Sequence, residues 1–397
     1  MKPTRRGFLR GVVGCALAPS LIARAEAERK VLVLVQLSGG NDGLNTVVPW
    51  SSPIYHNKRP NIGIKEDEVL KLDDRVGFHP SLVELKRFVD DGKLAVIEGV
   101  GYPDPVRSHF RSLDIWHTAR ATGRLSGPGW ISRACDAAYP EDMSSERVVH
   151  VGVRQPYSLR SAMRPPVTLS RRDRYQLFGR ASTKSALHEL SQESNTVGGK
   201  RSERLSRIRS VMRDAERSSA RIRGALASYE PSVEYPGGEF ARSLGMVAAT
   251  IAGNLGSRVL SVELDGFDTH GRQRQLHDPL LGDFDSSLGA FHRDLEQQGL
   301  LDSVVIMVFS EFGRRVKENA SAGTDHGTAG PMFLLGGGVR GGLHGQAPKL
   351  TNLDEFDLGF TTDFRSVYSA VIDRCFGIAP ETVLGAKYPV LDLFRPI

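Results

Sequence analysis

Apolar positions recur along the chain with two different periods. Several runs of four to eight residues are almost continuously apolar and rich in Val, Leu and Ile, which is typical of strands buried on both faces of a parallel sheet. These runs are 30–37, 94–100, 148–153, 258–264, 304–309 and 332–335. Other stretches repeat apolar residues every three or four positions, as one face of a helix does. These stretches are 80–91, 239–254, 278–297 and 363–376. The alternation predicts an α/β domain with a mostly parallel sheet.

Polar residues stand directly after three of the predicted strands. They are Asp42 after 30–37, Asp268 and His270 after 258–264, Glu311 after 304–309, and Asp325 with His326 on the next loop. In open α/β sheets, ligands bind in the crevice outside the carboxyl ends of the strands. We therefore expect these side chains to gather in one site.

The candidate site has the donor atoms of a metal centre. Carboxylate oxygens and imidazole nitrogens without thiolates suit Zn²⁺, Mn²⁺, Mg²⁺ or Ca²⁺. Six ligands exceed the needs of one catalytic zinc ion, so the set favours two divalent ions. Taken singly, a carboxylate such as Asp42 could instead be a turn former between Asn41 and Gly43.

A serine lies where a nucleophile could be presented. Ser108 follows the loop after the strand 94–100 and precedes a helix-like segment. A hydroxyl there would stand at the positive end of a helix, which favours an anion, but serine is also a common helix N-cap. Arg107 or Arg111 could bind an anionic oxygen, or be a surface charge. Six further histidines are individually expected to be structural, and His344 is the first reserve ligand. They are His79, His109, His117, His277, His292 and His344.

Residues 180–236 are predicted to form a helical insertion rich in arginine. An apolar stripe runs through the segment, and arginines crowd the other positions. No aromatic residues interleave with the arginines for base stacking, so a solvated helix face is favoured over nucleic-acid binding.

The first 27 residues are typical of an export signal. Thr4-Arg5-Arg6-Gly7-Phe8 carries paired arginines before a short, glycine-containing apolar run, as in twin-arginine signals. The apolar run is too short for a membrane span, so no stable membrane anchor is expected. Cleavage would follow Ala25 or Ala27. The sequence thus predicts recognition by the twin-arginine export machinery and a periplasmic domain over residues 28–397.

Composition refines this picture in two ways. The formal charge is +6, but residues 1–25 hold five basic and no acidic residues, so the remainder is nearly neutral and gives no sign of a nucleic-acid partner. Outside the signal there are two cysteines, Cys135 and Cys375. They are expected to be isolated buried thiols rather than a disulfide or a structural zinc site.

Several motifs together resemble a known superfamily. They are the strand-ending Asp42, Ser108, Asp268-Thr269-His270, Ser310-Glu311, and His326-Gly327 before Gly330-Pro331. This set resembles the alkaline phosphatase superfamily, which includes phosphatases and sulfatases. More closely, the motifs LSGGNDGLNTVVP, RSHF, FDTH, FSEFGR and GTDHG behind a twin-arginine signal are similar to an exported bacterial family called domain of unknown function 1501.

The superfamily resemblance implies a fold and a chemistry. It implies a three-layer αβα sandwich with a mostly parallel sheet, and hydrolysis of a small anionic phosphate or sulfate ester. It would make Asp42 a ligand shared by two metal ions, with Glu311 on the second ion. Asp268, His270 and His326 would bind the first ion, and Ser108 would be the nucleophile. The chain has Glu311-Phe312 where the superfamily commonly has Asp-His. That departure favours the alternative of an exported binding or assembly protein whose site is not catalytic.

Overall fold

The computed structural model describes residues 30–120, 127–142, 144–161, 164–170, 185, 188–189, 191, 200–351, 353 and 357–396. The predicted export signal and most of the first part of the predicted insertion lie outside these residues.

A nine-stranded sheet forms the centre of the molecule. Its order is β11-β5-β10-β9-β1-β8-β6-β7, with β12 also paired to β5. The strands are β1 (Val31–Ser38), β5 (Leu94–Gly101), β6 (Val148–Val151), β7 (Val167–Leu169), β8 (Val259–Asp265), β9 (Val304–Phe309), β10 (Gly330–Gly336), β11 (Gly342–His344) and β12 (Thr362–Asp363). β1 lies between β8 and β9 and is parallel to both. β10 is antiparallel to its neighbours β9 and β5. The rest of the sheet is parallel, so the sheet is mostly parallel, as predicted.

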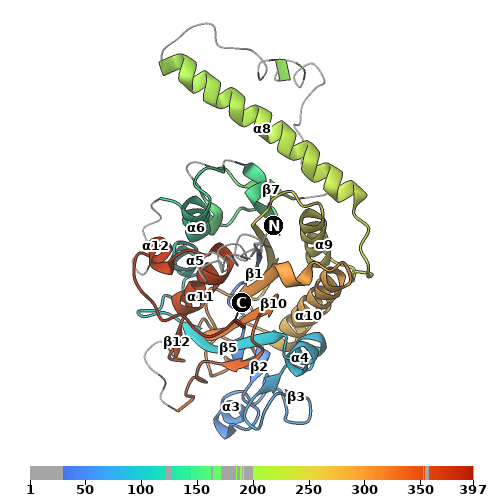
Figure 1. Ribbon diagram of the computed structural model, residues 1–397. Helices are drawn as coiled ribbons and strands as arrows, with labels where there is room; N and C mark the ends of the chain where they lie inside the picture. Colours follow the sequence, from blue (N-terminus) through green and yellow to red (C-terminus); the bar gives the residue numbers. More distant parts are fainter. Residues whose placement is uncertain are drawn as a thin grey trace, which may run out of the picture.

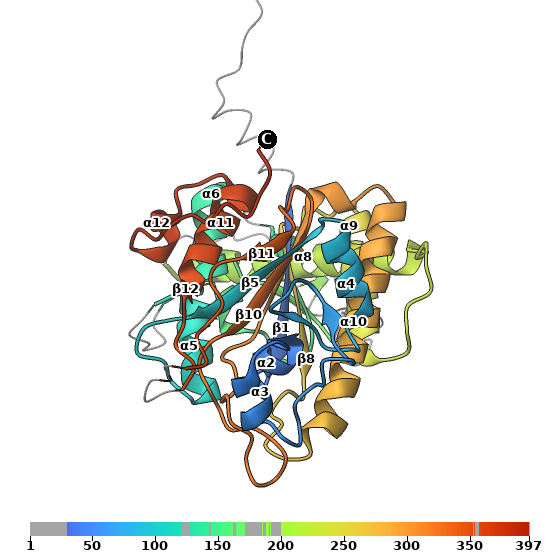
Figure 2. The ribbon, with the colours of Figure 1, turned by 90° about the horizontal axis from the view of Figure 1, so that it is seen from below.

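Helices cover both faces of this sheet (Figure 2). One face carries α5 (His109–Thr118), α6 (Trp130–Ala138), α11 (Phe364–Phe376) and α12 (Pro380–Leu384). The other carries α4 (Val83–Asp90), α9 (Glu239–Ala252) and α10 (Gln273–Gln297). Alternate residues of β1 enter the two cores: Val33 and Val35 pack on one side, Leu32 and Leu34 on the other. Burial on both faces explains why residues 31–35 of the strand are all apolar, and the three-layer αβα arrangement is confirmed.

A small subdomain that the sequence pattern did not predict follows β1. It contains α2 (Gly43–Thr46), α3 (Pro53–Lys58) and a three-stranded sheet of β2 (Val47–Val48), β3 (Leu70–Lys71) and β4 (Gly77–Phe78). Its elements are too short to carry a clear period. The described residues also include three single turns of 3₁₀ helix: η1 (Ser145–Arg147), η2 (Tyr157–Leu159) and η3 (Leu301–Ser303).

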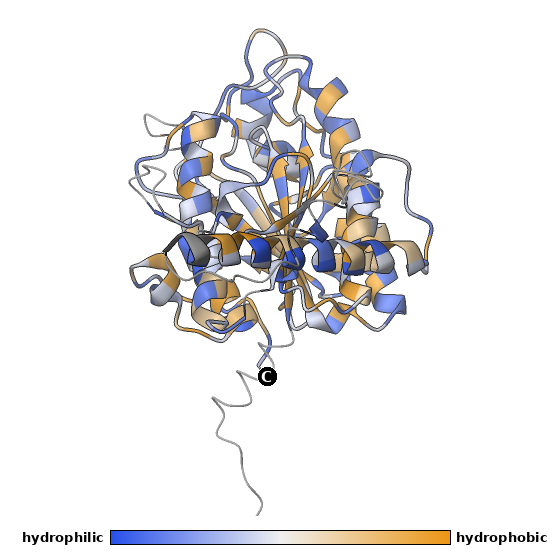
Figure 3. Cartoon of the chain, turned by 90° about the horizontal axis from the view of Figure 1, so that it is seen from above, coloured by the Kyte–Doolittle hydropathy of each residue, from blue (hydrophilic) through white to orange (hydrophobic). Residues whose placement is uncertain are grey.

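A long helix, α8 (Lys200–Ser228), extends from the body of the molecule (Figure 1). Ile222 and Leu226 near its end are buried, whereas Ile208 in its first half is 55% exposed. Figure 3 shows polar and apolar positions mixed along the helix. The chain that follows α8 is fixed to α10, because Asp294 accepts hydrogen bonds from the hydroxyls of Tyr229 and Tyr235.

Two details bear on the sequence predictions. α10 begins at Gln273, five residues before the predicted start, and includes Pro279. The helix continues on the amino side of the proline, where Gln273 and His277 are buried. Cys135 and Cys375 are free and buried, as predicted. In the part of the chain described, no helix combines the length and apolar character needed to cross a membrane.

Candidate metal centre

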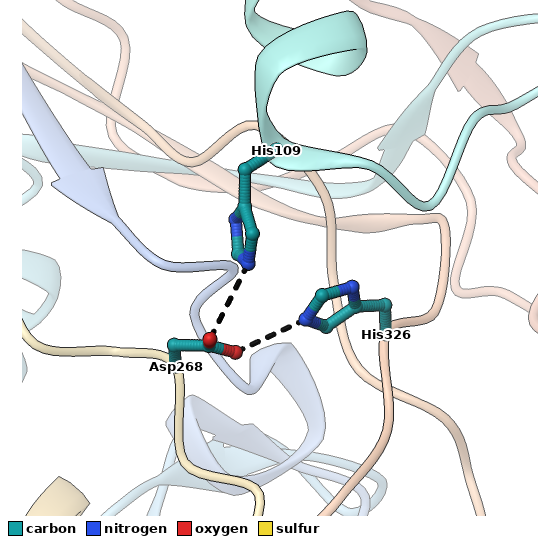
Figure 4. Close-up of side chains that lie close together, drawn as sticks. All are labelled: His109, Asp268 and His326. Atoms are coloured by element: carbon teal, nitrogen blue, oxygen red, sulfur yellow. Dashed lines mark hydrogen bonds and ion pairs between the residues drawn. The ribbon is translucent and has the colours of Figure 1, made fainter.

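Asp268 is the centre of a cluster of imidazole rings. It lies on the loop after β8, and its Oδ1 atom is 3.0 Å from His326 Nε2 and 3.1 Å from His270 Nε2. Its Oδ2 atom is 3.5 Å from His109 Nε2. Figure 4 shows the His109 and His326 rings pointing at this carboxylate from two different segments. Within the described residues, His109, Asp268 and His326 form the group whose donor atoms lie close enough together to hold a metal ion.

Each imidazole has an oxygen beside its other ring nitrogen. His109 Nδ1 is 2.8 Å from Glu311 Oε1, and His326 Nδ1 is 2.8 Å from the Arg107 carbonyl oxygen. His270 Nδ1 is 3.5 Å from Asp325 Oδ1. An oxygen acceptor at Nδ1 favours a proton there and leaves the lone pair on Nε2, which is how metal-binding histidines are oriented.

Two features of the donor atoms favour a cation beside them. His270 Nε2 and His326 Nε2 are only 3.0 Å apart, and two lone pairs at that distance repel unless a proton or a metal ion lies between them. His109 Nε2 is buried and makes no hydrogen bond within the described structure, a cost that a metal ion would remove. Three imidazole nitrogens and one carboxylate oxygen are a donor set that Zn²⁺ accepts.

The cluster opens to solvent on one side. The side chains of Asp268 and His270 are 47% exposed, whereas the His109 side chain is 27% exposed. A site with three to four protein donors and one open side leaves room for water or a substrate group, as catalytic zinc sites do.

Arg314 fixes the loops that form the site. Its buried guanidinium donates to the carbonyl oxygens of Gly40 and Phe267, and to Asp268 Oδ1 at 2.6 Å. Burial alone would raise the pKa of Asp268, but hydrogen bonds from Arg314 and His326 lower that pKa to about 2. The Asp268 carboxylate is therefore charged and held in place.

Two further residues shape the cluster. The buried Phe312 ring packs against His109 and His326, with ring centroids 4.8 Å apart in both pairs. Gly39 has a φ of +112°, and a Cβ atom there would lie 2.4 Å from the Asp268 backbone nitrogen. The glycine-rich turn after β1 is therefore needed for the close approach of the β8 loop.

The structure brings three of the six predicted ligands together at the centre: Asp268, His270 and His326. Glu311 and Asp325 lie one layer further out, beside the imidazoles of His109 and His270. Glu311 is buried, and its Oε1 also accepts a hydrogen bond from the Gly39 backbone nitrogen. These two carboxylates thus orient imidazoles in this structure rather than joining the central donors.

Asp42 has a different role in the structure from the one predicted. It is fully buried, and both of its oxygens accept hydrogen bonds from Arg59, at 2.6 and 3.0 Å. It also accepts from Gln273 and from the backbone nitrogen of Leu44. The expectation of two metal ions needed Asp42 and Glu311 as free ligands, and here both are occupied by protein donors.

His109 is the central residue that sequence reasoning set aside as structural. It is the first residue of α5, and Ser108 precedes it at the N-cap position. Ser108 is exposed, and its hydroxyl makes no capping hydrogen bond. Arg107 contributes its carbonyl oxygen to His326, and Arg111 lies 3.7 Å from Asp114 on the outer surface of α5. The signal for His109 was its place in the motif RSHF, directly after the predicted nucleophile.

Comparison with solved structures finds several chains that align with this one at low sequence identity. A protein of that superfamily from Vibrio parahaemolyticus is 10% identical, with a TM-score of 0.37, over 94% of this chain and 76% of its own. The PsFucS1 sulfatase from Pseudoalteromonas sp. is 10% identical, with a TM-score of 0.36, over 96% and 74%. The periplasmic domain of EcEptC from Escherichia coli, in complex with Zn, is 10% identical, with a TM-score of 0.34, over 78% and 72%.

Among curated proteins, no sequence matches the chain. A family model does match, over residues 29–379, and it spans every residue of the metal centre and of its supporting loops. Its description is "Protein of unknown function (DUF1501)". The chain is therefore a member of the DUF1501 family.

Proposed function

We propose that this protein holds a divalent metal ion through His109, Asp268, His270 and His326, and hydrolyses phosphate or sulfate esters there. The observation that supports this most directly is the convergence of three imidazole Nε2 atoms on one carboxylate. A bound ion would polarise an ester oxygen and make a nearby hydroxyl easier to ionise.

One ion, with zinc preferred, fits the arrangement of donors. The central atoms are three nitrogens and one oxygen, a set better suited to Zn²⁺ than to Mg²⁺ or Ca²⁺, which prefer oxygen ligands. Asp42 is neutralised by Arg59, so it does not call for a second cation.

The surrounding residues would keep the site ready to bind. Glu311 and the Arg107 carbonyl, each 2.8 Å from Nδ1, would hold protons on the Nδ1 atoms of His109 and His326. Arg314 holds Asp268 at a fixed angle between three loops. Such outer partners typically change metal affinity about 10–100-fold when they are removed.

Ser108 is the proposed nucleophile. Its exposed hydroxyl precedes His109 at the amino end of α5, where the helix dipole favours an anionic substrate group. Ser108 Oγ would bond to phosphorus or sulfur as the bond to the leaving-group oxygen breaks. The hydroxyl proton would pass to solvent, and water would then release the serine. Arg111, on the same turn, is proposed to attract the anionic ester.

Metal content tests the first half of the proposal. The full chain, purified without chelator, is expected to contain about one equivalent of Zn or another divalent metal by inductively coupled plasma mass spectrometry. His326→Ala and His270→Ala should lose it, while His344→Ala, a matched histidine whose Nε2 donates to the Arg340 carbonyl oxygen, should keep it. No metal in the wild type, and no uptake from Zn²⁺, Mn²⁺, Mg²⁺ or Ca²⁺, would refute the metal centre.

Turnover tests the second half. The metal-loaded protein is expected to hydrolyse p-nitrophenyl phosphate or p-nitrophenyl sulfate, and Ser108→Ala should reduce kcat at least about 100-fold without changing metal content. Metal binding without turnover of any phosphate or sulfate ester would instead support the non-catalytic binding protein.

Export is proposed from the sequence. Residues 1–27 would direct the folded protein through the twin-arginine machinery to the periplasm. Replacing Arg5 and Arg6 by lysine should leave the protein in the cytoplasmic fraction, and unchanged periplasmic recovery would contradict this route.

A further inference from the structure

One buried side chain connects two of the loops that carry the histidines of the metal centre. Thr269 directly precedes His270 on the loop after β8, and Thr324 lies two residues before His326 on the loop between β9 and β10. Both hydroxyls donate to one atom, Gln273 Oε1, at 3.3 Å from Thr269 and 2.6 Å from Thr324. Gln273 is the first residue of α10. A single oxygen on a helix therefore contacts both loops.

The nitrogen of the same amide group is held by Asp42. Gln273 Nε2 donates to Asp42 Oδ2, and a carboxylate offers only acceptors. The amide nitrogen must therefore face Asp42, which turns Oε1 toward the two threonines. Asp42 is itself held by two hydrogen bonds from the buried Arg59. The carboxylate that the sequence suggested as a metal ligand thus fixes the orientation of a glutamine.

These contacts are enclosed in the protein. The side chains of Gln273, Thr269, Thr324 and Asp42 are all fully buried. If either loop moved away, a buried hydroxyl and the glutamine oxygen would lose hydrogen bonds that water does not replace, which is unfavourable. The shared oxygen therefore opposes separate movement of the two loops.

The backbones of the two loops also meet beside this glutamine. The Thr324 nitrogen donates to the Thr269 carbonyl oxygen at 3.2 Å. The Gln273 nitrogen donates to the Ala322 carbonyl oxygen at 2.8 Å. The side chain and the backbone of Gln273 thus hold the same pair of loops.

The separation of two histidines depends on how these loops lie. Their Nε2 atoms, on His270 and His326, are 3.0 Å apart. A Cβ atom on Gly323 would lie 2.3 Å from the His270 carbonyl carbon, so the loops are already in close contact. We infer that Gln273 is a positioning residue that holds His270 and His326 at the separation at which they share one ion, a role that rests on the proposed metal centre.

Zinc affinity of the full chain, measured by competition with a fluorescent chelator, tests this role. Thr324→Val removes one hydroxyl but leaves the bond between Gln273 and Asp42, and it should weaken binding about 10-fold, as loss of an outer partner does. Thr324→Ser should bind zinc like the wild type, because serine offers the same donor. Gln273→Met should weaken binding further. The double variant should be no weaker than Gln273→Met, because both substitutions remove the same bond.

Two controls separate positioning from general loss of stability. Thr250→Val removes a buried hydroxyl that donates to the Met246 carbonyl oxygen within α9. Gln275→Met replaces an exposed glutamine in the first turn of α10. Both should bind zinc like the wild type. Wild-type affinity in Thr324→Val, or a double variant weakened by the product of the two single effects, would overturn the inference.

Hydrogen exchange of the metal-free chain tests the same role without the ion. Peptides covering residues 319–328 should exchange about fivefold faster in Gln273→Met than in the wild type, the equivalent of about one lost hydrogen bond. Gln275→Met should leave the rate unchanged. An unchanged rate in Gln273→Met would overturn the inference. Faster exchange in a protein that binds no zinc would refute the proposed metal centre but support the hold of Gln273 on the loops.

Discussion

Removing Arg59 is expected to destabilise the protein strongly. The Arg59 and Asp42 side chains are both fully buried, and they form a bidentate ion pair. Arg59 also donates to Asn45 and to the carbonyl oxygens of Val316 and Arg315. Arg59→Met keeps most of the side-chain volume but leaves a buried carboxylate without its counter-charge.

The expected cost follows from this geometry. Breaking a buried ion pair by removing one partner typically costs about 3–5 kcal/mol. For a chain of this length, that corresponds to a fall in Tm of about 4–6 °C, because the entropy of unfolding is about 2.1 cal/mol/K per residue. Thermal unfolding followed by circular dichroism measures the fall. The double variant Asp42→Asn, Arg59→Met should recover at least half of the loss, since it no longer buries a charge.

The pH dependence gives an independent check. In the wild type, burial acts to raise the pKa of Asp42, but the charge and hydrogen bonds of Arg59 outweigh burial, so the pKa is lowered. The ion pair contributes its full stability at pH values above the unfolded pKa of the carboxyl. That stability is lost as pH falls through the lower folded pKa. Without Arg59, burial raises the pKa of Asp42, so Arg59→Met should lose less stability at pH 5 than at pH 7. A loss below about 1 kcal/mol at pH 7, or a double variant no more stable than Arg59→Met, would refute this reasoning.

Three further predictions concern other parts of the molecule. Glu311→Gln should weaken metal binding about 10–100-fold in competition with a fluorescent chelator, and less than a threefold effect would show that Glu311 does not orient His109. Burial lowers the pKa of His292 to about 4, so the unfolded state takes up more protons than the folded state between about pH 6.5 and 4. As pH falls from 7.5 to 5, the free energy of unfolding of His292→Phe should therefore rise by about 2 kcal/mol relative to that of the wild type. Parallel pH profiles of the two proteins in urea unfolding would contradict this prediction. Asp294→Asn should speed proteolysis between α8 and α9, because it weakens the bonds from Tyr229 and Tyr235; cleavage at the wild-type rate would show that this tether is not needed.

The sequence indicated the sheet well because each strand is a continuous apolar run. β1 and β9 are buried along their whole length, and such runs have few other interpretations. The short strands β2, β3 and β4 were not predicted, because two residues carry no period. The antiparallel direction of β10 was also beyond sequence reasoning, since direction depends on the connecting loop.

The candidate site was only partly predictable for a related reason. Position after a strand identified Asp268, but the contacts that distinguish a central donor from an outer one depend on distant residues. Asp42 and Asp268 both follow buried strands, yet one faces Arg59 and the other faces three histidines. Arg59 lies in an irregular segment with no periodic signal. His109 became prominent only when α5 placed it beside Glu311, about 200 residues later in the chain.

The position of β1 in the sheet affects how the chain is made. β1 is synthesised early, but its partners β8 and β9 begin at Val259 and Val304. During translation, this mostly apolar strand has no neighbours in the sheet until β8 and β9 have left the ribosome. Late pairing of a long-range strand slows folding and exposes an aggregation-prone edge. Chaperone capture of ribosome-bound chains should therefore persist until residues beyond 309 have emerged.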